Sequence, residues 1–320
     1  MAADLFRVEI PLPGSPLKYL NSYVIRGGGR NLIIDTGLNR PLCLQAMRDC
    51  LHFLGIDLKH TDFYITHLHA DHLGLLDKLA VQGSSRVFFN HREADQFGGD
   101  FGVGEMLRHS VRAGFPEVEI AAIDFTPSTI YGSEVRPDFC LVQEDDRIRC
   151  GGYDFRCIET PGHTKGHICL YEEQKGILIS GDHILNDISP IIQLWSDDEN
   201  PLADYLASLQ KVAALDVDLV LPGHRTTFTD CKRRIEELRQ HHHNRIAEVL
   251  DIVHDDSLQS AYQVAAQMNW NLEFTSWEEL PVAQRWFATG EANAHLKYVQ
   301  EQGEVRRREI NGKFFFYSAD

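Results

Sequence analysis

The sequence lacks several features that would place the protein in a special environment. No stretch approaches the roughly 18 uninterrupted apolar residues that a membrane span needs. The N-terminus has no basic region followed by an apolar core, so we expect no signal peptide. The seven cysteines form no C-x-x-C pair, and scattered, odd-numbered cysteines are typical of reduced thiols. We therefore expect a cytoplasmic protein without a membrane partner.

Basic charge is also scarce. The chain of 320 residues has 31 Lys plus Arg against 47 Asp plus Glu, a formal net charge of −16. A field of this sign repels a phosphate backbone unless a local basic patch overrides it. A small-molecule substrate therefore fits the composition better than a long nucleic acid. The length and the 43% hydrophobic content suit one large core plus a small second domain.

Histidine, by contrast, is concentrated in one short run. The sequence HLHADH contains His67, His69, Asp71 and His72. A strand-like stretch rich in aromatic and β-branched residues precedes it, and a helical pattern follows it. A single histidine in such a turn is more often a loop residue bonded to backbone, but three imidazoles and a carboxylate in six residues favour a bound cation. The run predicts a metal site, for two ions.

Three later segments share one architecture, in which an apolar run ends in glycine and then a ligand-type residue. These residues are His163, Asp182 and His224. Glycine lets the backbone turn sharply and approach an ion closely. Each residue alone could be an ordinary polar group at a strand end. Together with the first cluster, they predict one site built from four loops.

These motifs resemble the metallo-β-lactamase superfamily over about residues 6–230. The run HLHADH, two Pro-Gly-His segments and one Gly-Asp-His segment carry the resemblance. Asp35, at the end of the apolar Leu-Ile-Ile, matches the family's early strand-end aspartate near the metal site. The resemblance implies an α+β fold, a four-layer αββα sandwich with the metals at one edge of the two sheets.

The resemblance also implies the metal ligands. All positions of the hydrolase pattern of the glyoxalase II and ribonuclease Z branches are filled: His67, His69, Asp71, His72, His163, Asp182 and His224. The implied first metal lies on His67, His69 and His163, the second on Asp71, His72 and His224, and Asp182 bridges them. Nitrogen and oxygen ligands without a thiolate suit two Zn²⁺ ions, and they also suit Fe²⁺ or Mn²⁺.

Two adjacent cations can activate a shared water for attack on a carbonyl or phosphoryl centre. Asp71 is a candidate to accept or relay the proton. His167 and His183 are candidates for contacts behind the ligands, or for packing. The predicted function is a dinuclear metallohydrolase acting on a small ester or thioester, of the acyl-CoA or glutathione thioester type. Alternatives are an endoribonuclease or phosphodiesterase, and a mononuclear iron persulfide dioxygenase that would leave part of the ligand set idle.

Residues 91–149 interrupt the strand-and-helix rhythm with six aromatic residues and many glycines and prolines. An insertion between the first ligand cluster and His163 would lie beside the metals in the implied fold. We weigh two hypotheses equally. The segment is a lid or pocket wall for an apolar part of the substrate, or it packs for its own sake.

Two domains are predicted, a hydrolase domain over 1–230 and a linker helix plus a winged-helix domain over 231–320. Helical patterns cover 230–254, 257–268, 277–287 and 290–302, and strand-like runs cover 304–310 and 313–318. The pair Asn311-Gly312 predicts a type I′ hairpin. We interpret the three histidines 241–243 as a solvated surface, since successive helix positions face different ways.

The C-terminal pattern is similar to the tail of hydrolases of the β-lactamase-like protein 2 type. Relatives with this tail include an endoribonuclease, which raises the nucleic-acid alternative. The residues Arg306-Arg307-Arg308 could touch phosphates, but Glu304 and Glu309 flank them. We therefore favour a role in packing or in a homodimer over nucleic-acid binding.

Overall fold

The computed structural model describes residues 4–96, 101–123, 138–254, 258–270 and 276–319, which divide into two compact units. Unit 1 comprises Met1–Gly99, Phe125–Pro190 and Gln210–Ile235, and unit 2 comprises Asp100–Asp124, Ile191–Leu209 and Glu236–Asp320. The chain passes from unit 1 to unit 2 for the last time near residue 235. Two earlier segments of the chain also belong to unit 2. No helix of the described residues is both long and apolar enough to span a membrane.

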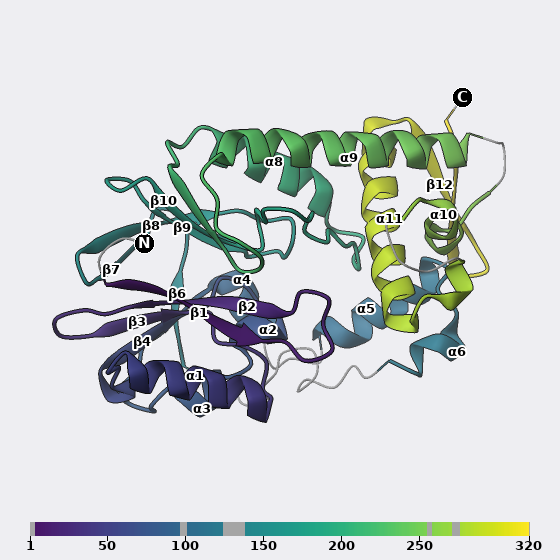
Figure 1. Cartoon of the computed structure of the whole chain (residues 1–320). Helices are drawn as coiled ribbons and strands as arrows, with labels where there is room; N and C mark the ends of the chain where they lie inside the picture. The colour runs from purple at the N-terminus through teal and green to yellow at the C-terminus, as the bar shows by residue number, and fades with distance from the viewer. Residues whose placement is uncertain (1–3, 97–100, 124–137, 255–257, 271–275, 320) are drawn as a thin grey trace. The chain divides into compact units, whose positions relative to one another are not determined.

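The first sheet of unit 1 has six strands, in the order β1-β2-β3-β4-β5-β6 (Figure 1). Their bounds are β1 Leu5–Pro11, β2 Tyr19–Ile25, β3 Asn31–Ile34, β4 Thr61–Tyr64, β5 Val87–Asn90 and β6 Phe139–Val142. The strands β1, β2 and β3 pair antiparallel, and β3 to β6 pair parallel. The connections carry α1 (Pro41–Phe53), η1 (Leu58–His60), α2 (Ala70–Leu73), α3 (Leu76–Leu79) and α4 (His91–Gln96).

The second sheet of unit 1 has five strands, in the order β11-β10-β9-β8-β7. Their bounds are β7 Arg147–Cys150, β8 Tyr153–Glu159, β9 Ile168–Glu172, β10 Ile177–Gly181 and β11 Leu219–Pro222. The pairs β7-β8, β8-β9 and β9-β10 are antiparallel, whereas β10-β11 is parallel.

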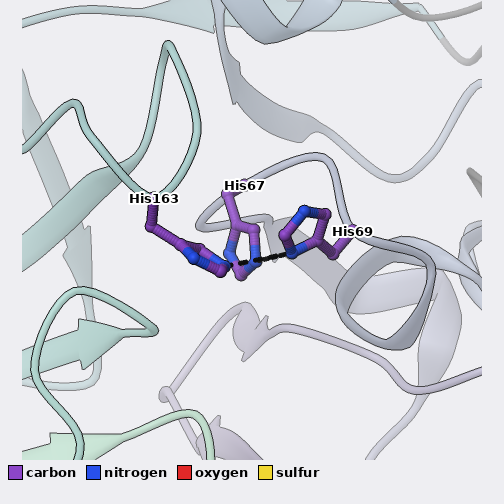
Figure 2. A group of neighbouring side chains, drawn as sticks. All are labelled: His67, His69 and His163. Atoms are coloured by element: carbon purple, nitrogen blue, oxygen red, sulfur yellow. Dashed lines mark hydrogen bonds between the residues drawn. The ribbon is translucent and has the colours of Figure 1, made fainter. Parts of the chain in front are cut away.

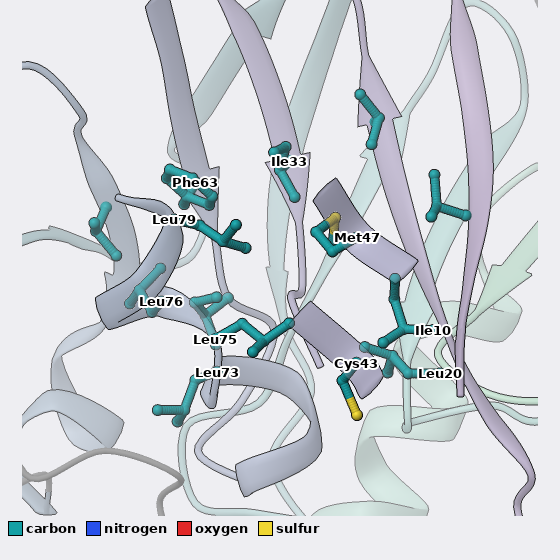
Figure 3. Packing of buried hydrophobic residues seen from close by; sticks show 14 of the residues in the cluster. Ile10, Leu20, Ile33, Cys43, Met47, Phe63, Leu73, Leu75, Leu76 and Leu79 are labelled. Carbon is teal, nitrogen blue, oxygen red and sulfur yellow. The ribbon is translucent and has the colours of Figure 1, made fainter. Parts of the chain in front are cut away.

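The short strands β3 and β4 are buried on both faces, as strands in the parallel part of a sheet commonly are. Side chains alternate between the faces of a strand. Ile33 and Phe63 therefore join the core under α1, α2 and α3 (Figure 3), whereas Leu32, Ile34 and Tyr64 join the core shared with the second sheet. This alternation stacks helices, first sheet and second sheet in layers.

The end of the segment 91–149 belongs to the two sheets and is not an insertion. It forms β6 in the first sheet and β7 in the second. Phe139 packs on Phe89, and Phe115 is fully buried against Tyr262. These two aromatic residues are core residues, because they fill space between neighbouring elements. Phe97, Phe125 and Tyr131 lie outside the described residues, and the lid role stays a prediction.

Unit 2 is mainly helical. Its helices are α5 (Phe101–Arg112), α6 (Glu117–Ile120), most of α8 (Pro201–Ala213), most of α9 (Cys231–Val253), α10 (Ala261–Gln267), η2 (Trp277–Glu279) and α11 (Val282–Gln302). The hairpin of β12 (Val305–Ile310) and β13 (Lys313–Ser318) follows. Both Asn311 and Gly312 have positive φ, as a type I′ turn requires, so the predicted hairpin is confirmed.

The prediction of two helices over 277–287 and 290–302 is wrong, because α11 runs unbroken through Gly290. Gly290, the start of the second predicted helix, lies inside α11 and makes room for a ring. A Cβ at position 290 would lie 2.4 Å from Cζ2 of Trp195, whose indole stacks on Trp286 with ring centroids 4.2 Å apart. The close approach of Trp195 to the helix backbone therefore requires glycine at this position.

Two further predictions about unit 2 need correction. The helix expected from residue 257 begins at Ala261, because Ser260 and Gln263 form a capping box. The three histidines 241–243 are not uniformly solvated. His242 is fully buried, with its Nδ1 3.2 Å from Nε2 of His295. It lies on the helix face that also buries Leu238 and Val249.

Candidate metal centre

All seven predicted ligands belong to unit 1 and lie shortly after strands, with Asp71 and His72 in the short helix α2 and the other five in loops. The run 67–72 follows β4, His163 follows β8, Asp182 follows β10 and His224 follows β11. These four strands deliver their ends to one edge of the two sheets, and the structure brings the seven side chains together there in three overlapping groups. His67 and His163, for example, are 96 positions apart in the chain and become neighbours in the fold.

The first group consists of His67, His69 and His163 (Figure 2). Nδ1 of His69 lies 3.0 Å from Nε2 of His67 and 3.0 Å from Nε2 of His163. Burial lowers the pKa of His67 well below its ordinary value, and the neighbouring imidazoles lower it further. The ring is therefore neutral, and a neutral imidazole offers a lone pair to a metal. Three such nitrogens facing one another are suited to one cation.

The second group consists of Asp71, His72 and His224. Nδ1 of His72 lies 2.8 Å from Oδ2 of Asp35, and Nδ1 of His224 lies 3.0 Å from the carbonyl oxygen of Tyr19. Each imidazole is thus oriented with Nε2 toward the site. The Nε2 atoms of His72 and His224 are buried, and among the described residues neither makes a well-formed hydrogen bond, since the nearest carboxylate oxygens lie 3.3–3.6 Å away. Buried polar atoms are rarely left so, and a cation would satisfy both.

Asp182 lies between the two groups. Its Oδ1 is 3.6 Å from Nε2 of His72, and its Oδ2 is 3.7 Å from Nε2 of His163 and 3.4 Å from Nε2 of His224. Oδ1 is also buried without a hydrogen-bond partner in the described part of the chain. A carboxylate that faces ligands of both groups has the position needed for a bridging ligand.

The carboxylates in and beside the second group favour a positive charge in the site. Burial acts to lower the pKa of His224, but Asp182 and Asp71 outweigh it and raise that pKa to about 10. Burial acts to raise the pKa of Asp71, but His72 and His224 outweigh it and hold that pKa below its ordinary value. Without a cation, the carboxylates draw protons onto the imidazoles. A divalent metal would replace these protons, so the donor set fits metal binding.

Several residues behind the ligands fix their orientation. Asp35 accepts hydrogen bonds from the Thr66 amide at 2.9 Å and hydroxyl at 2.8 Å, beside its contact with His72. His167, for which packing or loop anchoring was expected, accepts a hydrogen bond from the backbone amide of Asp182 at 3.2 Å. Its Nδ1 lies 2.8 Å from Oγ1 of Thr160. His167 therefore anchors the loop that carries Asp182, and His183 is fully buried with its ring centroid 6.1 Å from that of His167.

Sequence reasoning missed Asn21, which holds the loop of His224. Its amide nitrogen donates to the carbonyl oxygens of Pro222 at 2.9 Å and Arg225 at 2.8 Å, and its backbone amide donates to Gly223 at 2.7 Å. The available signal was a buried asparagine in the apolar strand β2. An amide in such a strand needs partners, and a nearby loop provides them.

Comparison with known proteins identifies the family. The family model described as "Metallo-beta-lactamase superfamily" matches residues 17–224. The chain belongs to the metallo-beta-lactamase superfamily. The chain is 27% identical to "Probable metallo-hydrolase YqjP" of Bacillus subtilis over 283 residues, which cover 83% of this chain and 85% of that one.

A second relative carries a more specific name. "Atrochrysone carboxyl ACP thioesterase" of Aspergillus fumigatus is 24% identical over 241 residues, which cover 74% of this chain but only 46% of the relative. Among solved structures, a beta-lactamase domain protein from Burkholderia ambifaria matches with a TM-score of 0.86 and 27% identity, covering 99% of this chain and 93% of that one. These matches confirm the predicted metallo-β-lactamase fold.

Proposed function

We propose that this protein is a dinuclear metal-dependent hydrolase acting on a small ester or thioester. One observation carries the proposal: two complete ligand groups, joined by Asp182, meet at one edge of the sheets with Nε2 of His72 and His224 oriented toward the gap. His67, His69 and His163 would hold one ion. A mononuclear dioxygenase would leave the second group without a purpose, although it is as complete as the first.

The chemistry follows from the donors. Divalent cations at such a site supply Lewis acidity, which brings the pKa of water toward neutrality and offsets negative charge on a carbonyl oxygen. Zn²⁺ suits these nitrogen and oxygen donors, and Fe²⁺ and Mn²⁺ also do. Asp71 is half-buried, with its Oδ2 3.3 Å from Nε2 of His224. Its carboxylate has the position and the ionised state needed to accept a proton from an attacking water.

A thioester or ester is the favoured substrate class. The relative named as an acyl carrier protein thioesterase supports it, and so does the absence of a thiolate from the ligand set. A cysteine at the position of Asp182 is usual in the classical β-lactamase branch, so antibiotic hydrolysis is disfavoured. The net charge of −16 disfavours a long nucleic acid as substrate.

Unit 2 also favours a small substrate over RNA. We propose that α10, α11 and the hairpin form a winged helix, because a single antiparallel bridge joins Gln259, before α10, to Phe316 of β13. Two of the three consecutive arginines of the hairpin, Arg307 and Arg308, are engaged. Arg307 pairs with Asp197 and lies 4.0 Å from the centroid of the Phe314 ring, while Arg308 stacks on Tyr317. An arginine held by a carboxylate is a poor phosphate ligand, so we propose a packing role for this element.

A reconstitution screen tests the proposal. Metal-free protein is loaded separately with zinc, manganese and iron, then assayed on acyl-CoA, acylglutathione, lactone and phosphodiester panels. We expect thioester or ester hydrolysis that needs two ions per chain and falls by at least a hundredfold in Asp71→Asn. The control Asp57→Asn alters an exposed aspartate of unit 1 and should keep full activity. One ion per chain, or hydrolysis of phosphodiesters alone, would overturn the proposal.

A further inference from the structure

Glu93 is a buried carboxylate that joins two of the ligand-bearing loops. It lies in the first turn of α4, directly after β5, and its side chain is fully buried. Oε2 accepts a hydrogen bond from the amide of Leu68 at 2.7 Å, and Oε1 accepts one from the amide of Gly166 at 2.6 Å. Leu68 stands between His67 and His69, and Gly166 follows His163 by three residues. One side chain thus connects the loops that carry all three imidazoles of the first group.

The surroundings of Glu93 are shaped for this contact. A Cβ at Gly166 would lie 2.5 Å from Oδ1 of Asn90 and 2.8 Å from Cγ of Glu93, so only glycine lets the loop approach this closely. Burial raises the pKa of the Glu93 carboxyl, and the Thr164 side chain and the two amide donors oppose that effect. A buried ionised carboxylate is unfavourable unless it is hydrogen-bonded, and short charge-assisted bonds to amides meet that need.

We propose that Glu93 is a positioning residue that sets the separation of the two loops, so that His67, His69 and His163 converge before a cation arrives. The inference rests on the proposed metal site and adds a residue that acts through hydrogen bonds to the backbone of two loops. The chemistry requires an ionised carboxylate, which accepts at both oxygens. A glutamine of the same shape accepts at one oxygen only and turns an amino group toward the other backbone amide. One of the two loops would then be released.

The test compares Glu93→Gln with Glu172→Gln. Glu172 is the matched control: it is also buried in unit 1, and its Oε2 accepts from the backbone amide of Lys175 at 2.6 Å, but its partner bears no ligand. Zinc affinity is measured by competition with a chromophoric chelator, and cobalt-loaded protein gives an absorption spectrum that reports ligand geometry. We expect Glu93→Gln to weaken zinc binding roughly tenfold to a hundredfold and to alter the cobalt spectrum. Glu172→Gln should lower the melting temperature while keeping both readouts unchanged.

Each outcome decides a different question. A folded Glu93→Gln protein with wild-type affinity and spectrum would overturn the positioning role, and equal losses in Glu172→Gln would reduce it to general stability. Wild-type protein that binds no metal would instead refute the proposed function. Amide hydrogen exchange on metal-free wild-type protein gives a test without substitution, should Glu93→Gln fail to fold. The amides of Leu68 and Gly166 should exchange slowly, and rapid exchange of both would show that the two loops are not held before metal binds.

Discussion

The substitution Asp35→Asn tests whether the buried carboxylate behind His72 sets the metal affinity of the second group. Asp35 has φ of 57°, in the left-handed region that asparagine also tolerates, so the backbone need not move. In the native protein, Oδ2 of Asp35 receives Nδ1–H of His72 and thereby leaves the lone pair of Nε2 for a cation. An asparagine can turn its amino group toward His72 and favour the opposite tautomer.

The magnitude follows from the hydrogen bonds at stake. Asp35 accepts three, two from Thr66 and one from His72, so the single oxygen of asparagine cannot satisfy all donors. A hydrogen bond to a charged group contributes about 1.5–3 kcal/mol. At about 1.4 kcal/mol per factor of ten, loss of the bond to His72 weakens binding roughly tenfold to a hundredfold. The first group should lose less, because its ligands do not contact Asp35.

Chelator competition with zinc resolves the two affinities. We expect Asp35→Asn to weaken one of the two binding steps by that factor, with two ions still bound at saturation. The control is Asp145→Asn, because Asp145 also has positive φ in unit 1 but pairs with Arg156 at the surface. If zinc affinity is unchanged at both steps in Asp35→Asn, the tautomer argument is refuted. If Asp145→Asn loses as much zinc affinity as Asp35→Asn, the effect comes from the backbone and not from the contact with His72.

Three further predictions concern stability. Chelation of the metals should lower the melting temperature by roughly 5–10 °C relative to protein in a hundredfold excess of zinc over its dissociation constant, and an unchanged melting curve would refute metal binding. Burial raises the pKa of Glu291 to about 7 against about 4.3 in the unfolded chain, so its ionisation destabilises the fold as pH rises between these values, by on the order of 3 kcal/mol. The melting temperature of Glu291→Gln relative to wild type should therefore be higher at pH 8 than at pH 5, and a pH-independent difference would contradict this. Gly290→Ala should lower the melting temperature, since overpacking against Trp195 costs about 1–3 kcal/mol and outweighs a gain of about 1 kcal/mol in helix propensity; an increase would refute the packing argument.

Local sequence indicated where the predicted ligands leave the sheets, because each of these segments repeats one simple pattern, an apolar strand followed by a ligand-type residue. The strand fixes where the chain leaves the sheet. Once the strands are predicted, the positions of His163, Asp182 and His224 at the strand ends follow. Gly290 shows where such reasoning fails. Its helix-breaking tendency is a local property, whereas the ring of Trp195 that requires it is 95 positions away in the chain. The burial of His242 could have been predicted from the sequence, because its spacing from Leu238 and Val249 places the three residues on one helix face.

Asp35 and Glu93 hold different groups of the site in place. Asp35 directly follows β3 and contacts the side chain of His72 in the second group, whereas Glu93 follows β5 and bonds to the backbone of the loops that carry the first group. The first group has three imidazoles, and the second adds the carboxylate of Asp71 to two imidazoles. Carboxylate oxygens favour harder cations than imidazole nitrogens do. Mixed loading with zinc and manganese should therefore place manganese preferentially in the second group, and Glu93→Gln should affect the zinc-selective step more than the manganese-selective one.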